Sequence, residues 1–348
     1  MRSTLKCNQL LFPCFFLLLI VFIGFAFYWR IFLMQPLLGP NQKLILDIQP
    51  GTSALGVIQQ GRRAGLFDQK SAFLFHVLLY VRGEQDRLQA GEYQFVSGIT
   101  PSLVLQKLVQ GDVLQHTVQI TEGWTAQDLL RSLHNDPAIL PTLKGLEGSQ
   151  IMISLGYSGT SLEGWFFPDT YFFTKGTKDV DILRRAHQAL LSHLQLAWMA
   201  RDPAITLKSP YEALILSSII EKEAALDEER SQISGVFHRR LRQGIPLQAD
   251  PTVIYGLGES FQGSLTRQDL KKDTPYNTYL HKGLPPTPIA LSGLKSIQAA
   301  LHPDDAKTLY FVAKGDGRHY FSRDLKEHNQ AVIKYQLGKQ NGKASKEE

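Results

Sequence analysis

The feature that most constrains this chain is a long uncharged run near its N-terminus. From Leu10 to Trp29 no charged side chain occurs, and Phe, Leu and Ile dominate the stretch. A helix of roughly 20 residues, rising about 1.5 Å per residue, can cross a hydrocarbon layer about 30 Å thick. A cleaved signal peptide would have a shorter apolar region ending in small residues, whereas this run ends in Tyr28, Trp29 and Arg30. We therefore expect an uncleaved transmembrane anchor at residues 10–30.

The charges that flank this run bear on its orientation. Arg2, Lys6 and the terminal amine precede it, and Arg30 and Lys43 follow it closely. Because basic residues are enriched in cytoplasmic flanks, the count slightly favours a cytoplasmic N-terminus at residues 1–9. No second long apolar run follows, so we expect a single-pass protein whose remaining residues lie on one side of the membrane.

Composition excludes several classes of function. The net charge of +5 is mild and spread along the chain, without the dense basic patch and interleaved aromatics of a nucleic-acid-binding protein. The only cysteines are Cys7 and Cys14, so the remaining chain holds no disulfide and no thiolate metal site. Neither metal-ligand spacing among the histidines nor a phosphate-binding glycine loop occurs. We expect no metal, no cofactor and no nucleic-acid partner.

The chain after the anchor has an α+β pattern. A Pro-, Gly- and Gln-rich linker at 31–43 precedes a subdomain at 44–115, a mixed α+β domain at 116–337 and a polar tail at 338–348 that we expect to be disordered. In the subdomain, the pattern predicts strand, helix, helix, strand and helix, near residues 44–48, 52–64, 71–81, 88–95 and 100–109.

A strand, a tight turn and a capped helix recur at residues 117–133. This recurrence suggests a duplicated or LysM-like unit that binds wall glycan, although an ordinary α+β packing module explains it equally well. Farther on, helical periodicity covers residues 211–242, as one helix or two. Basic residues and Gly244 end it.

Glu221 is the first candidate for chemistry. In a helix, Leu214, Ser218, Glu221 and Ala225 share one face, which is apolar apart from the serine and the glutamate. Such a carboxyl is partly desolvated, which raises its pKa and suits it to act as a general acid. The alternative is that Glu221 merely ends the apolar stripe and points to solvent. Glu223 faces away from Glu221, and we expect it on a solvent-exposed face that it shares with Asp227.

Three further segments carry polar and aromatic residues suited to a sugar. Residues 247–256 form a hydrogen-bonding, aromatic stretch after a helix stop, or else an Asp-Pro turn in which Thr252 caps a short helix. Residues 274–288 form a Pro- and Gly-rich loop with two tyrosines and an amide, which could wall a groove or be purely structural. Residues 162–173 form an aromatic run that belongs either to a core or to a groove.

Together these segments resemble the YceG-like family of endolytic murein transglycosylases. The motifs that carry the resemblance occur in family order and spacing. They are LEGWFFPDTY (162–171), IEKE (220–223), LQADPTVIYG (247–256), PYNT (275–278) and GLPP (283–286). With the anchor and the LysM-like part, the resemblance covers nearly the whole chain. It implies that residues 116–337 form a YceG-like catalytic domain.

The resemblance implies lytic cleavage of the β-1,4 bond between N-acetylmuramic acid and N-acetylglucosamine, with 1,6-anhydro ends as the product. The family's acid/base is the first glutamate of E-K-E, here Glu221. One carboxyl suffices, whereas most glycosidases pair two. Carried over by the matched motifs, the substrate-binding residues are Glu163, Trp165, Asp169, Ser218, Glu223, Gln248, Asp250, Thr252, Tyr255, Tyr276, Asn277, Thr278 and Pro285.

Two departures from the family pattern stand out: Ala224 replaces an expected hydroxyl residue, and Arg239 replaces an expected asparagine. The family further implies a cell inner (plasma) membrane location, a periplasmic or extracytoplasmic catalytic domain, and termination of nascent glycan strands. Its implied partners are peptidoglycan strands and peptidoglycan synthases (penicillin-binding proteins). A hydrolysing muramidase and a non-catalytic wall-binding scaffold remain as alternatives.

Overall fold

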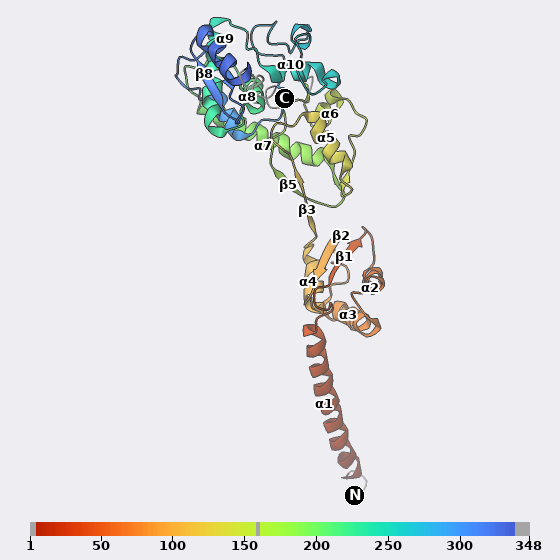
Figure 1. Ribbon diagram of the computed structural model, residues 1–348. Coiled ribbons are helices and arrows are strands. Elements are labelled where there is room, and N and C mark those ends of the chain that lie inside the picture. Colours follow the sequence, from red (N-terminus) through yellow and green to blue (C-terminus); the bar gives the residue numbers. More distant parts are fainter. Residues whose placement is uncertain (1–4, 158–160, 338–348) are drawn as a thin grey trace, which may run out of the picture. The chain divides into compact units, whose positions relative to one another are not determined.

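The computed structural model describes residues 5–157 and 161–337 (Figure 1). The chain divides into two compact units, Met1–His116 and Thr117–Glu348. Helices and strands occur in both, so the predicted mixed α+β class is confirmed. Residues 1–4 and the tail at 338–348, for which we predicted a cytoplasmic location and disorder, lie outside the described residues.

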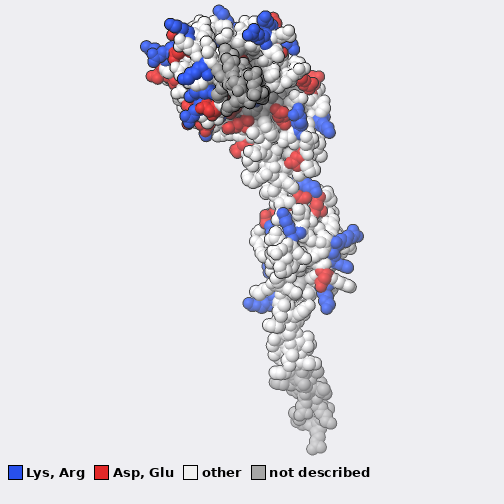
Figure 2. Space-filling model, viewed as in Figure 1, with Lys and Arg blue, Asp and Glu red and all other residues white. Residues whose placement is uncertain are grey.

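The first unit begins with a long helix, α1 (Leu5–Met34). Its segment Phe15–Met34 is the one helix among the described residues that is long and apolar enough to cross a membrane. The side chains from Phe15 to Phe27 are largely exposed, and Figure 2 shows the visible described part of α1 as mostly uncharged surface. The helix continues past Arg30, and Phe32 is buried in the core of the unit.

Two strands and three further helices complete the first unit. β1 (Lys43–Ile48) pairs antiparallel with β2 (Gly91–Val96). Between the strands lie α2 (Ala54–Arg63) and α3 (Gln69–Arg82), and α4 (Pro101–Gln110) follows them. The predicted order of elements is thus confirmed. The side chains of Ser53, Asp68 and Thr100 cap the three helices by accepting backbone hydrogen bonds.

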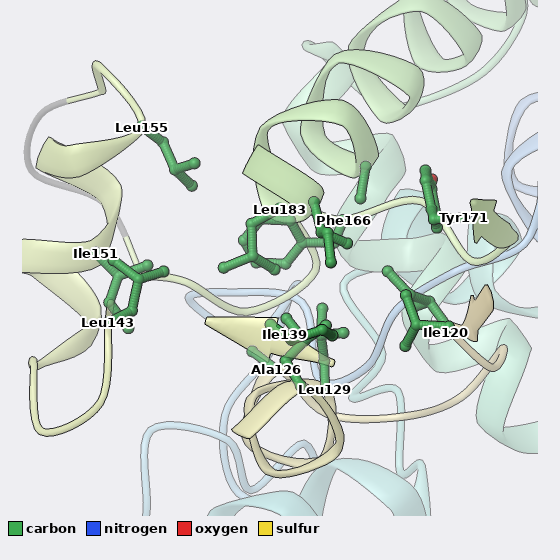
Figure 3. Close-up of a cluster of buried hydrophobic side chains, with 14 of the residues drawn as sticks. Ile120, Ala126, Leu129, Ile139, Leu143, Ile151, Leu155, Phe166, Tyr171 and Leu183 are labelled. Carbon is green, nitrogen blue, oxygen red and sulfur yellow. The ribbon is translucent and has the colours of Figure 1, made fainter. Parts of the chain in front are cut away.

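The second unit opens with an α/β layer. β3 (Gln115–Gln119) pairs with β5 (Thr170–Thr174), and β4 (Ile139–Leu140) pairs in parallel with β6 (Thr177–Lys178). The helices of this layer are α5 (Ala126–Asn135), α6 (Gly148–Ser154) and α7 (Asp179–Met199). Their core is continuous, and Figure 3 shows Leu129, Ile139, Phe166 and Leu183 gathered in it. The aromatic run at 162–173 therefore contributes mainly to a core.

The rest of the second unit is mostly helical. It contains α8 (Pro210–Glu223), α9 (Arg230–Gln243), α10 (Asp250–Leu257) and α11 (Leu294–Leu301), then the antiparallel hairpin β7 (Tyr310–Ala313) and β8 (His319–Ser322), and α12 (Leu325–Val332). Short 3-10 turns lie at Asp227–Glu229, Gly258–Ser260 and Asp269–Lys271, and a π-helical turn at Ile333–Leu337.

The helical segment at 211–242 is two helices. Ala224 is extended (ψ 110°) and ends α8, and α9 starts at Arg230. Consequently Ala225 is not on the helical face of Glu221, as expected from periodicity, but is exposed beyond the helix end. Every residue of α8 from Ala213 to Ile220 is buried, so α8 is the central helix of a second core that also includes Phe237 and Ile297. The end of α8 therefore stands on a rigid base.

Candidate functional site

Glu221 lies in the last turn of α8 and is engaged on both carboxylate oxygens. Oε1 accepts a hydrogen bond from Nη1 of Arg230 (3.1 Å), and Oε2 accepts one from the backbone N–H of Gly293 (2.9 Å). Its side chain is only 5% exposed, so the alternative that it points to solvent is wrong. Arg230 also contacts Asp227 and Ser296. Glu221 thus ties α8 to the starts of α9 and α11.

A second carboxyl, Glu122, lies near Glu221. It comes from the turn after β3, which the sequence indicated only as a turn. Burial raises the pKa of Glu122, and the negative charge of Glu221 adds to the rise. A β-carbon on Gly293 would overlap the Glu122 carboxylate, so this glycine makes room for it. No sequence pattern links residues this far apart.

Glu223, the last residue of α8, has a different environment. It is half-buried and lines a pocket of about 510 Å³ together with Gln248, Asp250, Tyr279 and Arg240. Burial, and then the charge of Asp250, raise the pKa of Glu223 to about 8. Its position at the negative end of a helix acts in the same direction. Glu223 is therefore protonated for a large part of the time near neutral pH.

This placement corrects the expectation that Glu223 shares a solvent-exposed face with Asp227. The turn after Ala224 separates the two carboxyls. Asp227 is exposed and pairs with Arg230 and Lys295, while Glu223 faces the pocket. Helical periodicity does not extend across the break, which is why the two residues do not share a face.

The loop before α10 forms one wall of the pocket. Gln248 has a left-handed backbone (φ 51°), which is unusual for a residue other than glycine. Its N–H donates to the carbonyl of Thr278 (3.0 Å), and its Oε1 accepts from Nη1 of Arg240 (3.2 Å). The hydroxyl of Tyr279 donates to Oδ1 of Asp250 (2.5 Å). The wall thus combines an amide, a carboxylate and a phenol, which together can bind sugar hydroxyls.

The opposite wall comes from the C-terminal hairpin and α12. Tyr310, Phe311, His319 and His328 contribute to it. Glu229 accepts hydrogen bonds from the backbone N–H of His319 (2.9 Å) and lies 2.7 Å from its Nδ1. Sequence reasoning missed this wall because the hairpin carries no catalytic motif. The aromatic residues clustered in β7 and β8 were its only signal.

Glu163 joins the two cores of the second unit. Its Oε1 accepts from the N–H of Ala126 at the start of α5 (2.9 Å), and its Oε2 accepts from the hydroxyl of Tyr255 on α10 (3.2 Å). The residue is 5% exposed, and burial raises its pKa to about 7. The Tyr255 ring lies 4.8 Å from that of Tyr276, whose hydroxyl bonds Thr287 (2.8 Å). These residues connect the start of α5, α10 and the loop at 276–287, and they do not line the pocket.

The remaining predicted residues also make contacts within the protein. Ser218 accepts from the N–H of Ile289 (3.0 Å), and Thr252 lies 2.8 Å from Thr278. The N-terminal cap of α10 is Ala249, so the predicted capping of this helix by Thr252 is wrong. The Thr252 hydroxyl instead donates to the carbonyl of Ala249. Only Glu223, Gln248 and Asp250 of the predicted set line the pocket.

Four residues of the predicted set lie elsewhere in the second unit. Asn277 is fully buried and donates to the carbonyls of Leu270 and Lys272. Trp165 stacks on Tyr211, with ring centres 5.4 Å apart. Asp169 is exposed and accepts from the N–H of Thr170 (2.7 Å), and Pro285 is buried.

The structure shows where the two residues that depart from the family pattern, Ala224 and Arg239, lie and what they contact. Ala224 is 8% exposed at the end of α8, so the hydroxyl expected there is absent from the helix end that carries Glu221. Arg239 lies on α9, and its guanidinium donates to Asp304 and to the backbone and side chain of Thr308. Arg239 therefore fixes the segment that leads to the hairpin, and it is not among the residues that line the pocket.

The chain is similar to several known proteins. The model of the YceG-like family matches residues 46–334. The endolytic murein transglycosylase of Bacillus subtilis (strain 168) is 30% identical over 335 residues, which are 90% of this chain and 91% of the relative. The enzyme of the same name from Streptococcus pneumoniae (strain ATCC BAA-255 / R6) is 31% identical over 186 residues, 52% of this chain and 33% of the relative.

A solved structure of a yceG-like protein from Listeria monocytogenes is 28% identical to this chain. It covers 84% of this chain and 99% of its own, with a TM-score of 0.47. Because the family model spans most of the chain and the B. subtilis relative matches nearly all of it, this chain belongs to the YceG-like family.

Proposed function

We propose that this chain is a membrane-anchored endolytic lytic transglycosylase of peptidoglycan. It cleaves the β-1,4 bond between N-acetylmuramic acid and N-acetylglucosamine in glycan strands and leaves 1,6-anhydro ends. The observation that carries the proposal is a pocket in which one carboxyl, Glu223, has its pKa raised to about 8. That pocket occurs in a chain 30% identical, over 90% of its length, to a protein named endolytic murein transglycosylase.

We propose Glu223 as the acid/base, with Glu221 as the alternative. The family resemblance implies Glu221, but its carboxylate is bound to a guanidinium and a backbone N–H. Both of its carboxylate oxygens are thus already engaged within the protein. Glu223 faces the pocket and retains its proton near neutral pH because of burial and Asp250. A general acid needs both properties.

The reaction then needs one carboxyl acting twice. Protonated Glu223 gives its proton to the glycosidic oxygen as the bond from that oxygen to the muramic C1 breaks. The oxygen of the muramic C6 hydroxyl bonds to C1, and its proton passes to the Glu223 carboxylate. Glu223 ends protonated and no water is consumed. Asp250 and Tyr279 lie beside Glu223 and can hold sugar hydroxyls.

Digestion of purified peptidoglycan, with mass analysis of the new ends, tests this proposal. Wild-type protein is expected to yield anhydro ends. Glu223→Gln is expected to yield no cleavage, and Glu221→Gln, two residues away, is the matched control that keeps cleavage. The reverse result would return the acid/base role to Glu221.

A hydrolysing muramidase is the second candidate, because Asp250 supplies a second carboxyl in the same pocket. It predicts reducing ends in the same digest. A non-catalytic wall-binding scaffold predicts no cleavage by the wild-type protein. The identity of the ends therefore separates all three functions.

The finer assignments extend the proposal. We propose that residues 44–115 bind wall glycan as a LysM-like unit; the two antiparallel strands enclosing α2 and α3 support this. We also propose that α1 crosses the cell inner (plasma) membrane with a cytoplasmic N-terminus, so that the second unit acts on nascent strands outside the cytoplasm, beside peptidoglycan synthases. Protease protection in oriented vesicles tests the orientation, and pull-down on purified glycan strands tests the binding.

A further inference from the structure

The outer face of α3 is apolar although nothing in the described chain covers it. Phe73, Tyr80 and Val81 are 67%, 75% and 67% exposed, and the half-buried Val77 lies between them. At this spacing the four side chains form one stripe along the helix. The opposite face is also apolar, because Phe75, Leu78 and Leu79 are buried in the core. In a helix that is apolar on both faces, one face packs on the core and the other is expected to contact a second apolar environment.

The position of α3 beside α1 indicates what that surrounding is. The two helices belong to the same compact unit, and α3 lies near the C-terminal end of α1 (Figure 1). A crevice of about 350 Å³ separates them. Its lining includes Tyr28, Ile31 and Phe32 of α1, Gln35 just after α1, and Lys70, Ser71 and Leu74 of α3. The first turns of α3 therefore lie level with the last turns of the apolar segment Phe15–Met34.

The depth follows from helix geometry. At about 1.5 Å per residue, Tyr28 lies about 9 Å below Met34 along α1. Interfacial helices bury their apolar faces about 5–10 Å into the boundary between headgroups and acyl chains, so the two depths agree. Exposed cationic residues, Lys70 and Arg82, stand at either end of α3, where they can reach lipid phosphates. Between these two residues, the exposed ionisable side chains of α3 are His76 and Tyr80.

We propose that α3 is an interfacial helix whose outer face, Phe73, Val77, Tyr80 and Val81, lies in the surface of the membrane that α1 crosses. The occupant of this face is lipid, because α1 brings the face to the bilayer surface. The inference rests on the proposed membrane anchor. Two contacts, one through α1 and one along α3, would hold the first unit in a fixed orientation on the bilayer, which a single spanning helix cannot do.

Site-directed spin labelling of the full chain in phospholipid nanodiscs tests this. Cys7 and Cys14 are first replaced by Ser, and single cysteines are then introduced as Phe73→Cys, Tyr80→Cys, Ile23→Cys or Leu55→Cys. Ile23 lies within α1 and is the reference for lipid. Leu55 is the matched control. It is an exposed apolar residue (52%) on α2, which follows the C-terminal end of β1.

Labels at 73 and 80 are expected to collide with oxygen, relative to a water-soluble nickel chelate, severalfold more often than the label at 55. Labels at 73 and 80 that match the label at 55, while the label at 23 is in lipid, would overturn the α3 proposal and leave the anchor intact. A water-exposed label at 23 would instead refute the anchor itself. Spin–spin broadening at 73 that disappears on dilution with unlabelled chain would show that a second copy, not lipid, covers the face.

Discussion

Glu221 and Glu223 are two residues apart at the end of one helix, yet they have opposite surroundings. Glu221 is bound by a guanidinium and a backbone N–H and is nearly inaccessible. Glu223 faces a pocket beside another carboxyl and has a raised pKa. In the proposed function the same residue type serves two purposes: Glu221 stabilises the structure, and Glu223 transfers the proton. Environment, not residue type, divides the roles.

The largest expected effect is that of Glu223→Gln on cleavage. General acid–base catalysis contributes about 10²- to 10⁴-fold to a rate, so the variant should lose at least about 100-fold in kcat. The fold should persist, since the amide fills the same space. Cleavage rates on purified glycan, with circular dichroism as the check on folding, measure this. Near wild-type turnover by Glu223→Gln would end the assignment.

Glu221→Ala should act on stability. It leaves the Arg230 guanidinium without one of its carboxylate partners, and breaking a buried pair in this way costs about 3 kcal/mol. Urea denaturation measures the loss. Replacing both members, as Glu221→Leu with Arg230→Met, should restore much of it, because no unpaired buried charge remains. A double variant as unstable as Glu221→Ala would show that the pair is not the source.

Glu163→Ala should destabilise the fold by about 2 kcal/mol, because the N–H of Ala126 and the hydroxyl of Tyr255 lose their acceptor. The pKa of Glu163, about 7 in the folded chain, lies above its ordinary value near 4.5. This residue's contribution to stability is thus fully present below pH 4.5 and is lost as the pH rises through about 7. Glu163→Gln should flatten that dependence, as measured by unfolding at several pH values.

The smallest expected effect is a shift in pH dependence. If protonated Glu223 is the acid, kcat/KM should fall as the pH rises through about 8. Asp250→Asn removes the negative charge that helps to raise this pKa, so the fall should begin at lower pH. Rate profiles of the two proteins, each compared with its own maximum, provide the measurement. A descending limb that stays in place, or moves to higher pH, would contradict the coupling.

Much of the fold could be predicted because its signals are local. Ser53, Thr100 and Thr125 are of the residue types that favour helix N-termini, and they cap α2, α4 and α5; Gly244 ends α9 in a left-handed conformation (φ 64°). The pairing of β3 with β5, across some fifty residues, had no such signal. The site followed the same rule. Gln248 and Asp250, which belong to a matched motif, line the pocket, whereas no motif indicated the hairpin wall.

The sequence by itself determined the long apolar segment near the N-terminus, the order of elements in the first unit, and the motifs that place the chain in its family. Only the tertiary structure distinguished the two glutamates. Periodicity places a side chain on a face of its own helix, but the groups that surround a carboxyl come from other elements. Arg230 reaches Glu221 from α9, and Asp250 approaches Glu223 from α10. Those neighbours exist only once the helices have packed.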